Sequence, residues 1–185
     1  MEQRALVLAA RDGDHDAFAL LAGQALARLD AVARLILRDA DLARDAVQEA
    51  MVKAWRDLPG LRDPERWDAW VHRITVNSSI EAARRRRRRV VEIELLDNDA
   101  LATPDAQEQV LDRQVLEEAL ASLEPEQRAL VVLRYYLGQT VPEAADTLGI
   151  PLGTAKSRLH RSLLHMRSVV VRPDRATAYG PGDQA

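Results

Sequence analysis

The sequence contains no cysteine and very few aromatic side chains. Without thiols, a disulfide framework, thiolate chemistry and a zinc ribbon are all excluded. Aromatic residues make up 4% of the chain and Phe18 is the only phenylalanine, so any core has to be mainly aliphatic. No apolar run approaches the roughly 20 residues that a membrane-spanning helix needs, and the first residues lack the basic start and apolar stretch of a secretory signal. We therefore expect a cytoplasmic protein without membrane insertion.

Signals of catalysis are also missing from the sequence. It has no glycine-rich phosphate loop, no convincing pair of nucleophile and base, and no cluster of metal-ligand residues. His160 and His165 are five residues apart, which is a poor spacing for a shared metal on one helix. We predict that the protein is not an enzyme, needs no cofactor and has no metal site.

Hydrophobic side chains recur at three- and four-residue steps, which is typical of amphipathic helices. The first stripe consists of Phe18, Leu21, Ala25, Leu29, Val32 and Ile36, and the second of Val47, Met51, Ala54 and Leu58. Asp41 is a candidate N-cap for the second helix, which should stop at Leu58-Pro59-Gly60. A third helix should begin at Asp63-Pro64. No segment shows the period-two alternation of strands, so we predict an all-α fold.

The helical periodicity is lost from residue 92 to residue 106, an acidic stretch that contains Asn98, Thr103 and Pro104. We therefore predict two small helical domains, residues 1–91 and 107–171, joined by an acidic flexible linker, residues 92–106. Residues 172–185 are rich in proline and glycine and are expected to form a disordered tail.

The net charge of −3 hides a strong segregation of charge. Residues 72–91 hold seven arginines and one acid, residues 92–118 hold nine acids and one base, and residues 147–173 hold five bases and no acid. Two basic patches separated by an acidic stretch suggest two surfaces for a polyanion, because lysine and arginine gain affinity by displacing counterions from phosphates. The alternative is that these runs are merely solvated surface.

The second domain contains a predicted helix-turn-helix. Thr140 and Glu143 form a capping box in front of a short helix, Gly149 allows a left-handed turn, and residues 151–166 form a second helix with basic residues outside its apolar stripe. In such a motif the second helix enters the major groove of DNA. An ordinary helical hairpin is the alternative, although the acid-free basic face on the second helix favours DNA binding.

Two sets of motifs resemble the sigma-70 family. Leu123–Arg128, Leu133–Tyr136, Glu143–Ala145 and Gly149–Arg161 resemble region 4, while Asp45–Glu49, Ala54–Trp55, Trp70–Asn77 and Arg84–Arg89 resemble region 2. The absence of the family's other regions points to the extracytoplasmic-function (ECF) group. The resemblance implies a bacterial sigma factor that binds core RNA polymerase, recognises the −10 and −35 elements of promoter DNA and assists promoter melting. It also implies an anti-sigma factor as a candidate partner.

The same resemblance implies three sets of site residues. The polymerase-binding residues are Asp41, Asp45, Gln48, Glu49, Val52 and Arg56. At 100° per residue, all of these except Glu49 fall within about 80° of one another, offset from the apolar stripe; a solvated polar face is the alternative. The −10 set is Leu61, Arg62, Asn77, Arg73, Arg84, Arg85 and Arg86. The −35 set is Thr154, Lys156, Ser157, Arg158, His160 and Arg161.

Some alternatives stay open at this level. Trp67 and Trp70 have the spacing of a core face, and we expect Trp70 to be mainly structural. The acidic linker is either a plain tether or a segment that imitates nucleic-acid phosphates in the RNA path of the polymerase. The whole protein could instead be a helix-turn-helix regulator that is not a polymerase subunit, or an interaction protein that sequesters a partner; Asn77 and the Asp45–Glu49 motif favour the sigma factor.

Overall fold

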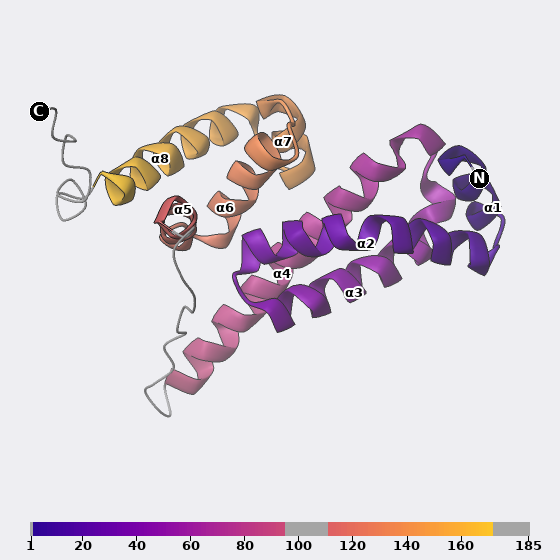
Figure 1. The fold of residues 1–185 in the computed structure, drawn as a ribbon, viewed down its shortest axis with the longest axis horizontal. Coiled ribbons are helices and arrows are strands. Elements are labelled where there is room, and N and C mark those ends of the chain that lie inside the picture. Colours follow the sequence, from indigo (N-terminus) through magenta and orange to yellow (C-terminus); the bar gives the residue numbers. More distant parts are fainter. Residues whose placement is uncertain (1, 95–110, 172–185) are drawn as a thin grey trace, which may run out of the picture.

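The computed structural model describes residues 2–94 and 111–171, which are helical and contain no β-strand. The first unit consists of α1 (Gln3–Arg11), α2 (His15–Leu37), α3 (Ala40–Asp57) and α4 (Trp67–Glu94), with two short 3₁₀ turns, η1 (Leu58–Gly60) and η2 (Pro64–Arg66), between α3 and α4. The second unit consists of α5 (Leu111–Ala121), α6 (Pro125–Val131), a π-helical turn η3 (Val132–Tyr136), α7 (Val141–Leu148) and α8 (Leu152–Val170). The predicted all-α fold is confirmed for the described residues (Figure 1).

Aspartate side chains define where the helices of the first unit begin. Asp14 accepts hydrogen bonds from the backbone N–H groups of Asp16 and Ala17 at the start of α2. Asp39 does the same for Asp41 and Leu42 at the start of α3. The predicted N-cap at Asp41 is therefore wrong, since Asp39 comes two residues earlier and satisfies the free N–H groups of the first turn.

The start and end of the third predicted helix differ in detail from the expectation. Asp63 is an N-cap, as predicted, but it caps the 3₁₀ turn η2, and α4 begins only at Trp67. At the other end α4 continues to Glu94, so residues 92–94 of the predicted linker are helical. The rest of that linker and the predicted tail, residues 172–185, lie outside the described residues.

The core of the first unit lies between α1, α2, α3 and the first half of α4. Leu21, Ala25 and Leu29 of α2 are buried against Val47 and Ala54 of α3, as their spacing predicts. Trp67 is almost completely buried, and its ring lies next to those of Phe18 and Trp70. The nine-residue helix α1 closes this core with Leu6, Val7 and Ala10 and was not predicted.

The predicted helix-turn-helix is formed by α7 and α8. The Thr140 hydroxyl accepts from the backbone N–H of Glu143, and the Glu143 carboxylate accepts from that of Thr140, which completes the capping box. Gly149 ends α7 with φ 64°, a left-handed conformation that glycine adopts without steric cost. The buried residues Ala144 and Ala145 of α7 lie in the same cluster as Ala155 and Leu159 of α8, so the apolar stripe of α8 is confirmed.

The two units pack against each other. α6 contacts both α2 and α4, and the buried cluster of the second unit includes Val32 and Ile36 of α2 and Val76 and Ile80 of α4. In Figure 1, α6 and α7 lie beside the first unit, while the last turns of α4 extend away from it. Among the helices that the structure describes, none combines the length and the apolar character needed to cross a membrane.

Candidate functional site

The candidate polymerase-binding residues share one exposed face of α3. Asp41, Asp45, Gln48, Val52 and Arg56 are all exposed, and Val52 has 64% of its surface open to solvent. The core stripe of the same helix points the other way, because Val47 and Ala54 are buried. An isolated exposed valine needs no explanation, but a valine in the middle of a polar stripe is a suitable centre for a contact with a partner.

Glu49, at the edge of this face, is held by an ionic network between α3 and α4. Its carboxylate lies 3.0 Å from Lys53 Nζ and 2.6 Å from the Arg85 guanidinium, and Lys53 also contacts Glu81 at 2.7 Å. Burial raises the pKa of Glu49, but the hydrogen bonds from Arg85 and Lys53 outweigh it, so that this pKa lies below its usual value. Glu49 and Arg85 therefore have a structural role in joining α3 to α4.

The network predicts a pH-dependent stability. Because the pKa of Glu49 is lowered in the folded chain, the contribution of Glu49 is complete above the pKa that it has in the unfolded chain and is lost as the pH falls through its folded value. Glu49→Gln should lower the urea midpoint of unfolding at pH 7, and the difference from the unmodified chain should shrink on acidification. Glu65→Gln, at an exposed carboxylate 3.9 Å from Arg4, is the control. A difference that stays constant with pH would contradict the network.

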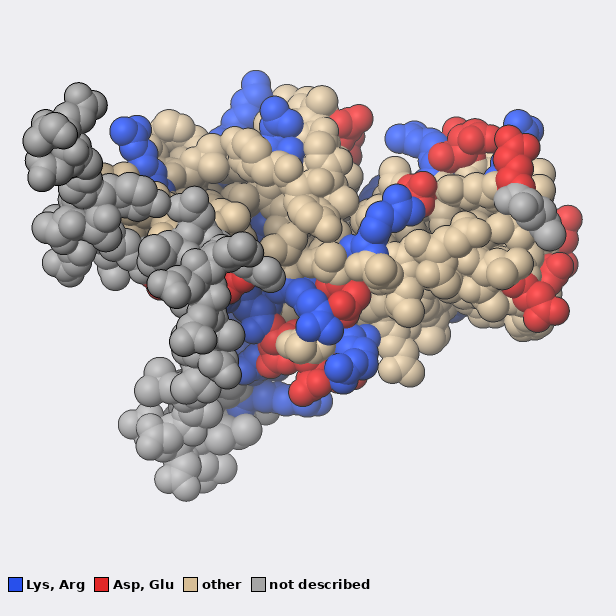
Figure 2. All heavy atoms as spheres, viewed as in Figure 1, with Lys and Arg blue, Asp and Glu red and all other residues tan. Residues whose placement is uncertain are grey.

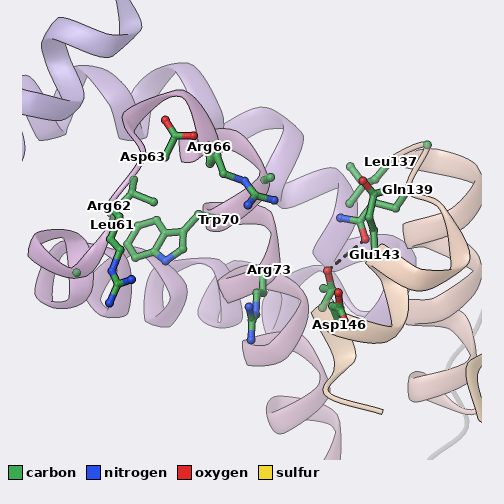
Figure 3. Close-up of a pocket in the computed structure, with 14 residues that line it drawn as sticks. Leu61, Arg62, Asp63, Arg66, Trp70, Arg73, Leu137, Gln139, Glu143 and Asp146 are labelled. Carbon is green, nitrogen blue, oxygen red and sulfur yellow. Dashed lines mark hydrogen bonds between the residues drawn. The ribbon is translucent and has the colours of Figure 1, made fainter. Parts of the chain in front are cut away.

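Three of the candidate −10 residues, Leu61, Arg62 and Arg73, border a cleft of about 820 Å³. Arg62, Trp70 and Arg73 line it from the first unit, and Gln139, Glu143 and Asp146 line it from the second unit (Figure 3). Leu61 also lines the cleft, but only 6% of its surface is exposed and it packs in the core of the first unit. Trp70 packs partly against that core and partly borders the cleft, so the structure places it in both surroundings.

Asn77 is separated from that cleft and lies in a smaller cavity of about 190 Å³. The cavity is also lined by Arg84 of α4, by Glu126 of α6 and by Arg158 of α8. The structure therefore brings one predicted −10 residue, Asn77, next to one predicted −35 residue, Arg158.

The arginine run on α4 spreads its side chains in several directions. Arg85 turns to Glu49 of α3 at 2.6 Å, and Arg86 turns to Asp39, the N-cap of α3, at 2.7 Å. Arg84 and Arg87 point to the second unit, where Arg84 donates to Glu126 at 2.8 Å and Arg87 donates to Glu124 at 3.1 Å. Figure 2 accordingly shows blue and red side chains interleaved in the lower centre of the molecule instead of an unbroken basic surface.

The recognition helix α8 has a basic outer face. Lys156, Ser157, His160 and Arg161 are exposed, whereas Thr154 and Arg158 are half-buried. Arg161 Nε donates to the Ser157 carbonyl at 3.3 Å, an i to i−4 contact that holds its side chain along the helix. These exposed donors can bind base edges and phosphates in a major groove.

One arginine that lines the cleft was missed in the sequence, and the burial of a second arginine was not foreseen. Arg66 lines the large cleft beside Arg62 and Arg73. Its position in the turn directly before α4, close to Arg62 in the sequence, could have indicated this. Arg128 is 8% exposed, and its Nε has no partner among the described residues. Burial lowers the pKa of Arg128, and nothing in an isolated Gln127-Arg128-Ala129 sequence indicates that burial.

The described residues gather no three His, Asp or Glu side chains into a group that could hold a metal ion. The candidate site thus consists of an exposed stripe on α3, a cleft lined by arginines and a basic recognition helix.

Comparison with protein families assigns both units. Residues 21–89 match the model of sigma-70 region 2, and residues 113–166 match that of sigma-70 region 4. The chain is 36% identical to the RNA polymerase sigma-E factor of Streptomyces avermitilis over 135 residues, which is 73% of this chain and 74% of that protein. It is 36% identical to the ECF RNA polymerase sigma factor SigL of Mycobacterium tuberculosis over 132 residues, 70% of this chain and 75% of that protein.

Solved structures show the same fold. The sigma factor RpoE of Bartonella quintana, in complex with the anti-sigma factor NepR, matches with a TM-score of 0.67 at 29% identity, covering 84% of this chain and 98% of that one. CnrH in complex with the cytosolic domain of CnrY matches with a TM-score of 0.62 at 25% identity, covering 91% of this chain and 96% of that one.

Proposed function

The chain belongs to the sigma-70 family of RNA polymerase sigma factors, in its ECF group, and from this premise we propose that it binds core RNA polymerase and directs it to specific promoters. The observation that carries the proposal is the presence of region 2 and region 4 in one chain, in that order, on two separate helical units. A regulator that only binds duplex DNA needs the second unit but has no use for the first.

The docking surface for the polymerase in this proposal is the α3 stripe of Asp41, Asp45, Gln48, Val52 and Arg56, with Glu49 at its edge. Its exposure and its position opposite the core stripe support this assignment. A partner that covers the stripe removes the Val52 side chain from water and leaves the charges at the rim, which is how a specific interface is commonly built.

The −10 element is assigned to residues 1–91. Melting DNA costs a few kcal/mol per unstacked base, and the protein can compensate by binding an extruded base and the displaced phosphates. Arg62, Arg73 and Arg84 are exposed cations suited to phosphate, and the Asn77 amide both donates to and accepts from a base edge. Arg85, Arg86 and Leu61 support this surface indirectly. Arg85 binds Glu49 and Arg86 binds Asp39, which hold α4 against α3, and Leu61 packs in the core of the first unit.

The −35 element is assigned to residues 107–171. Lys156, Ser157, His160 and Arg161 on the exposed face of α8 contact bases and phosphates, while Thr154 and Arg158 lie at the edge of that face, close to the DNA backbone. Arginine or lysine facing guanine is the commonest specific pair in the major groove.

The proposal also covers the setting in which the protein works. It acts in the cytoplasm and has no catalytic activity of its own, because RNA synthesis is performed by the polymerase. An anti-sigma factor is a further proposed partner, supported by the similarity to RpoE of Bartonella quintana, which was solved with NepR.

A binding experiment tests the assignment against the alternative regulator. The purified chain, labelled with a fluorophore at its N-terminus, is titrated with bacterial core RNA polymerase and separately with genomic duplex fragments. A sigma factor should bind core polymerase with a dissociation constant below about 1 µM and select promoter fragments only in its presence. Tight and selective binding to duplex DNA without any affinity for core polymerase would establish the regulator instead.

A further inference from the structure

A cavity of about 470 Å³ has no role in the proposed function. Arg28 of α2 and Asp68 and His72 of α4 line it from the first unit, and Tyr136 and Gln139 line it from the second. None of these five residues belongs to the polymerase-binding, −10 or −35 sets. The volume lies within the range of about 300–1,000 Å³ that is usual for sites of small molecules, so the chemistry of the lining decides what the cavity can bind.

His72 is the buried polar side chain of this lining. It is 8% exposed, and its Nδ1 lies 2.6 Å from the backbone carbonyl oxygen of Asp68. Because a carbonyl oxygen only accepts, Nδ1 carries the proton of the ring and Nε2 is left as an acceptor. Nε2 is buried and has no hydrogen-bond partner among the described residues. Since nearly all buried polar atoms of folded proteins are paired, His72 lacks a donor that a ligand can supply.

The π-helical turn η3 supplies an exposed aromatic ring to the cavity. The turn ends in Tyr135 and Tyr136, which expose 59% and 53% of their surface. The Arg134 guanidinium lies over the ring of Tyr135, 5.5 Å from its centroid, whereas Tyr136 lines the cavity. π-helical turns are frequent at functional sites, and tyrosine rings are common stacking partners of flat ligands. Tyr136 therefore offers a surface on which a planar ring can stack.

The charges at the cavity balance each other. Arg28 Nη2 lies 3.1 Å from Asp68 Oδ1, and Asp68 Oδ2 accepts a hydrogen bond from Gln3 at 3.3 Å. An anion in the cavity would be repelled by Asp68 and a cation by Arg28, so the lining favours an uncharged ligand. Gln139 Oε1 accepts from the Thr147 hydroxyl at 3.2 Å, which leaves the amide NH₂ group of Gln139 as a donor.

We propose that this cavity binds an uncharged purine nucleoside. Its base stacks on Tyr136, its exocyclic amine donates to His72 Nε2, and a ring nitrogen accepts from the amide of Gln139. A purine with an amine next to a ring nitrogen combines these three properties in one neutral, planar group. A water molecule would satisfy Nε2 alone, whereas a nucleoside also covers the tyrosine ring and pairs with the amide. The site is independent of the proposed function, since it uses none of the residues assigned to the polymerase or the promoter.

Titration with a fluorescent nucleoside tests the site on the purified full chain. The probe is 2-aminopurine riboside, whose fluorescence is quenched when its base stacks on an aromatic ring. The dissociation constant should be on the order of 100 µM, as expected for a ligand of about 20 non-hydrogen atoms that binds with ordinary efficiency. No quenching at about tenfold that concentration would overturn the proposal.

Two neighbouring tyrosines provide a matched pair of variants. Tyr136→Ala should weaken binding of the probe about tenfold, which is within the usual contribution of one base stacked on an aromatic ring. Tyr135→Ala is the control, because Tyr135 has a similar exposure and does not line the cavity. His72→Phe keeps a ring but removes the acceptor, and should also weaken binding about tenfold; because His72 is buried, the exposed Tyr136 decides the test if His72→Phe does not fold. Equal affinities of Tyr135→Ala and Tyr136→Ala would overturn the site.

A further titration separates a free nucleoside from a base within a DNA strand, because both carry the same ring. The 2-aminopurine base is placed inside a short single-stranded oligonucleotide, and its quenching is compared for the unmodified chain and Tyr136→Ala. We expect Tyr136 to matter for the free nucleoside and not for the oligonucleotide. Quenching that depends on Tyr136 in the oligonucleotide alone would assign the cavity to DNA and overturn the proposal. These titrations contain no polymerase, so their failure is distinct from a failure of the proposed function.

Discussion

Val52→Glu is expected to weaken binding to core RNA polymerase by about a hundredfold, which is close to 3 kcal/mol. Val52 lies at the centre of the polar stripe on α3 and is 64% exposed in the free chain. A glutamate there costs nothing in the free protein, but in the complex its charge would be buried without a partner.

The control for this variant is Leu20→Glu on α2. Leu20 is also an exposed apolar side chain, at 52%, so the substitution makes the same chemical change outside the stripe. The dissociation constant for core polymerase is measured by fluorescence anisotropy, and circular dichroism checks that both variants fold. If Val52→Glu bound as tightly as Leu20→Glu, α3 would not be the docking surface.

The second large effect is expected for Lys156→Ala/Arg161→Ala on the recognition helix. Each side chain is exposed on α8, and each good base contact contributes about 1–3 kcal/mol. Binding of the reconstituted holoenzyme to a promoter with an intact −35 element should fall about a hundredfold.

Arg4→Ala/Arg167→Ala is the matched control, because it removes the same charge at exposed positions away from the start of α8. Its effect should be severalfold smaller. The decisive comparison uses a promoter whose −35 element has been scrambled. On that promoter the α8 variant and the unmodified chain should bind with similar affinity; an undiminished difference would mean that the two residues act without recognising the −35 element.

The elements of this fold could be predicted well because their signals are local. The stripes of α2 and α3, the capping box at Thr140 and the left-handed Gly149 follow from residues that are neighbours in the sequence. The misassigned N-cap of α3 shows the limit of local signals. Asp39 and Asp41 both precede the apolar stripe of α3, and only the backbone conformation shows that Asp39 is the N-cap. The helix α1 has too few turns to establish a period.

The packing of the two units could not be predicted. Periodicity shows that Val32 and Ile36 are turned inward, but it does not show that their partners lie on α6, about 100 residues away in the sequence. Likewise, six consecutive arginines indicate a basic surface, whereas the acids that bind Arg84, Arg85, Arg86 and Arg87 come from α3, from its N-cap and from α6. Long-range ion pairs leave no local pattern in the sequence.

The most direct measurement of the central claim is a map of transcription start sites. Core RNA polymerase and genomic DNA fragments are incubated with and without the purified chain, and the 5′ ends of the RNA are sequenced. The account predicts new, defined start sites whose upstream DNA shares one motif near −10 and another near −35. Transcripts that are the same in position and number with and without the chain would contradict it.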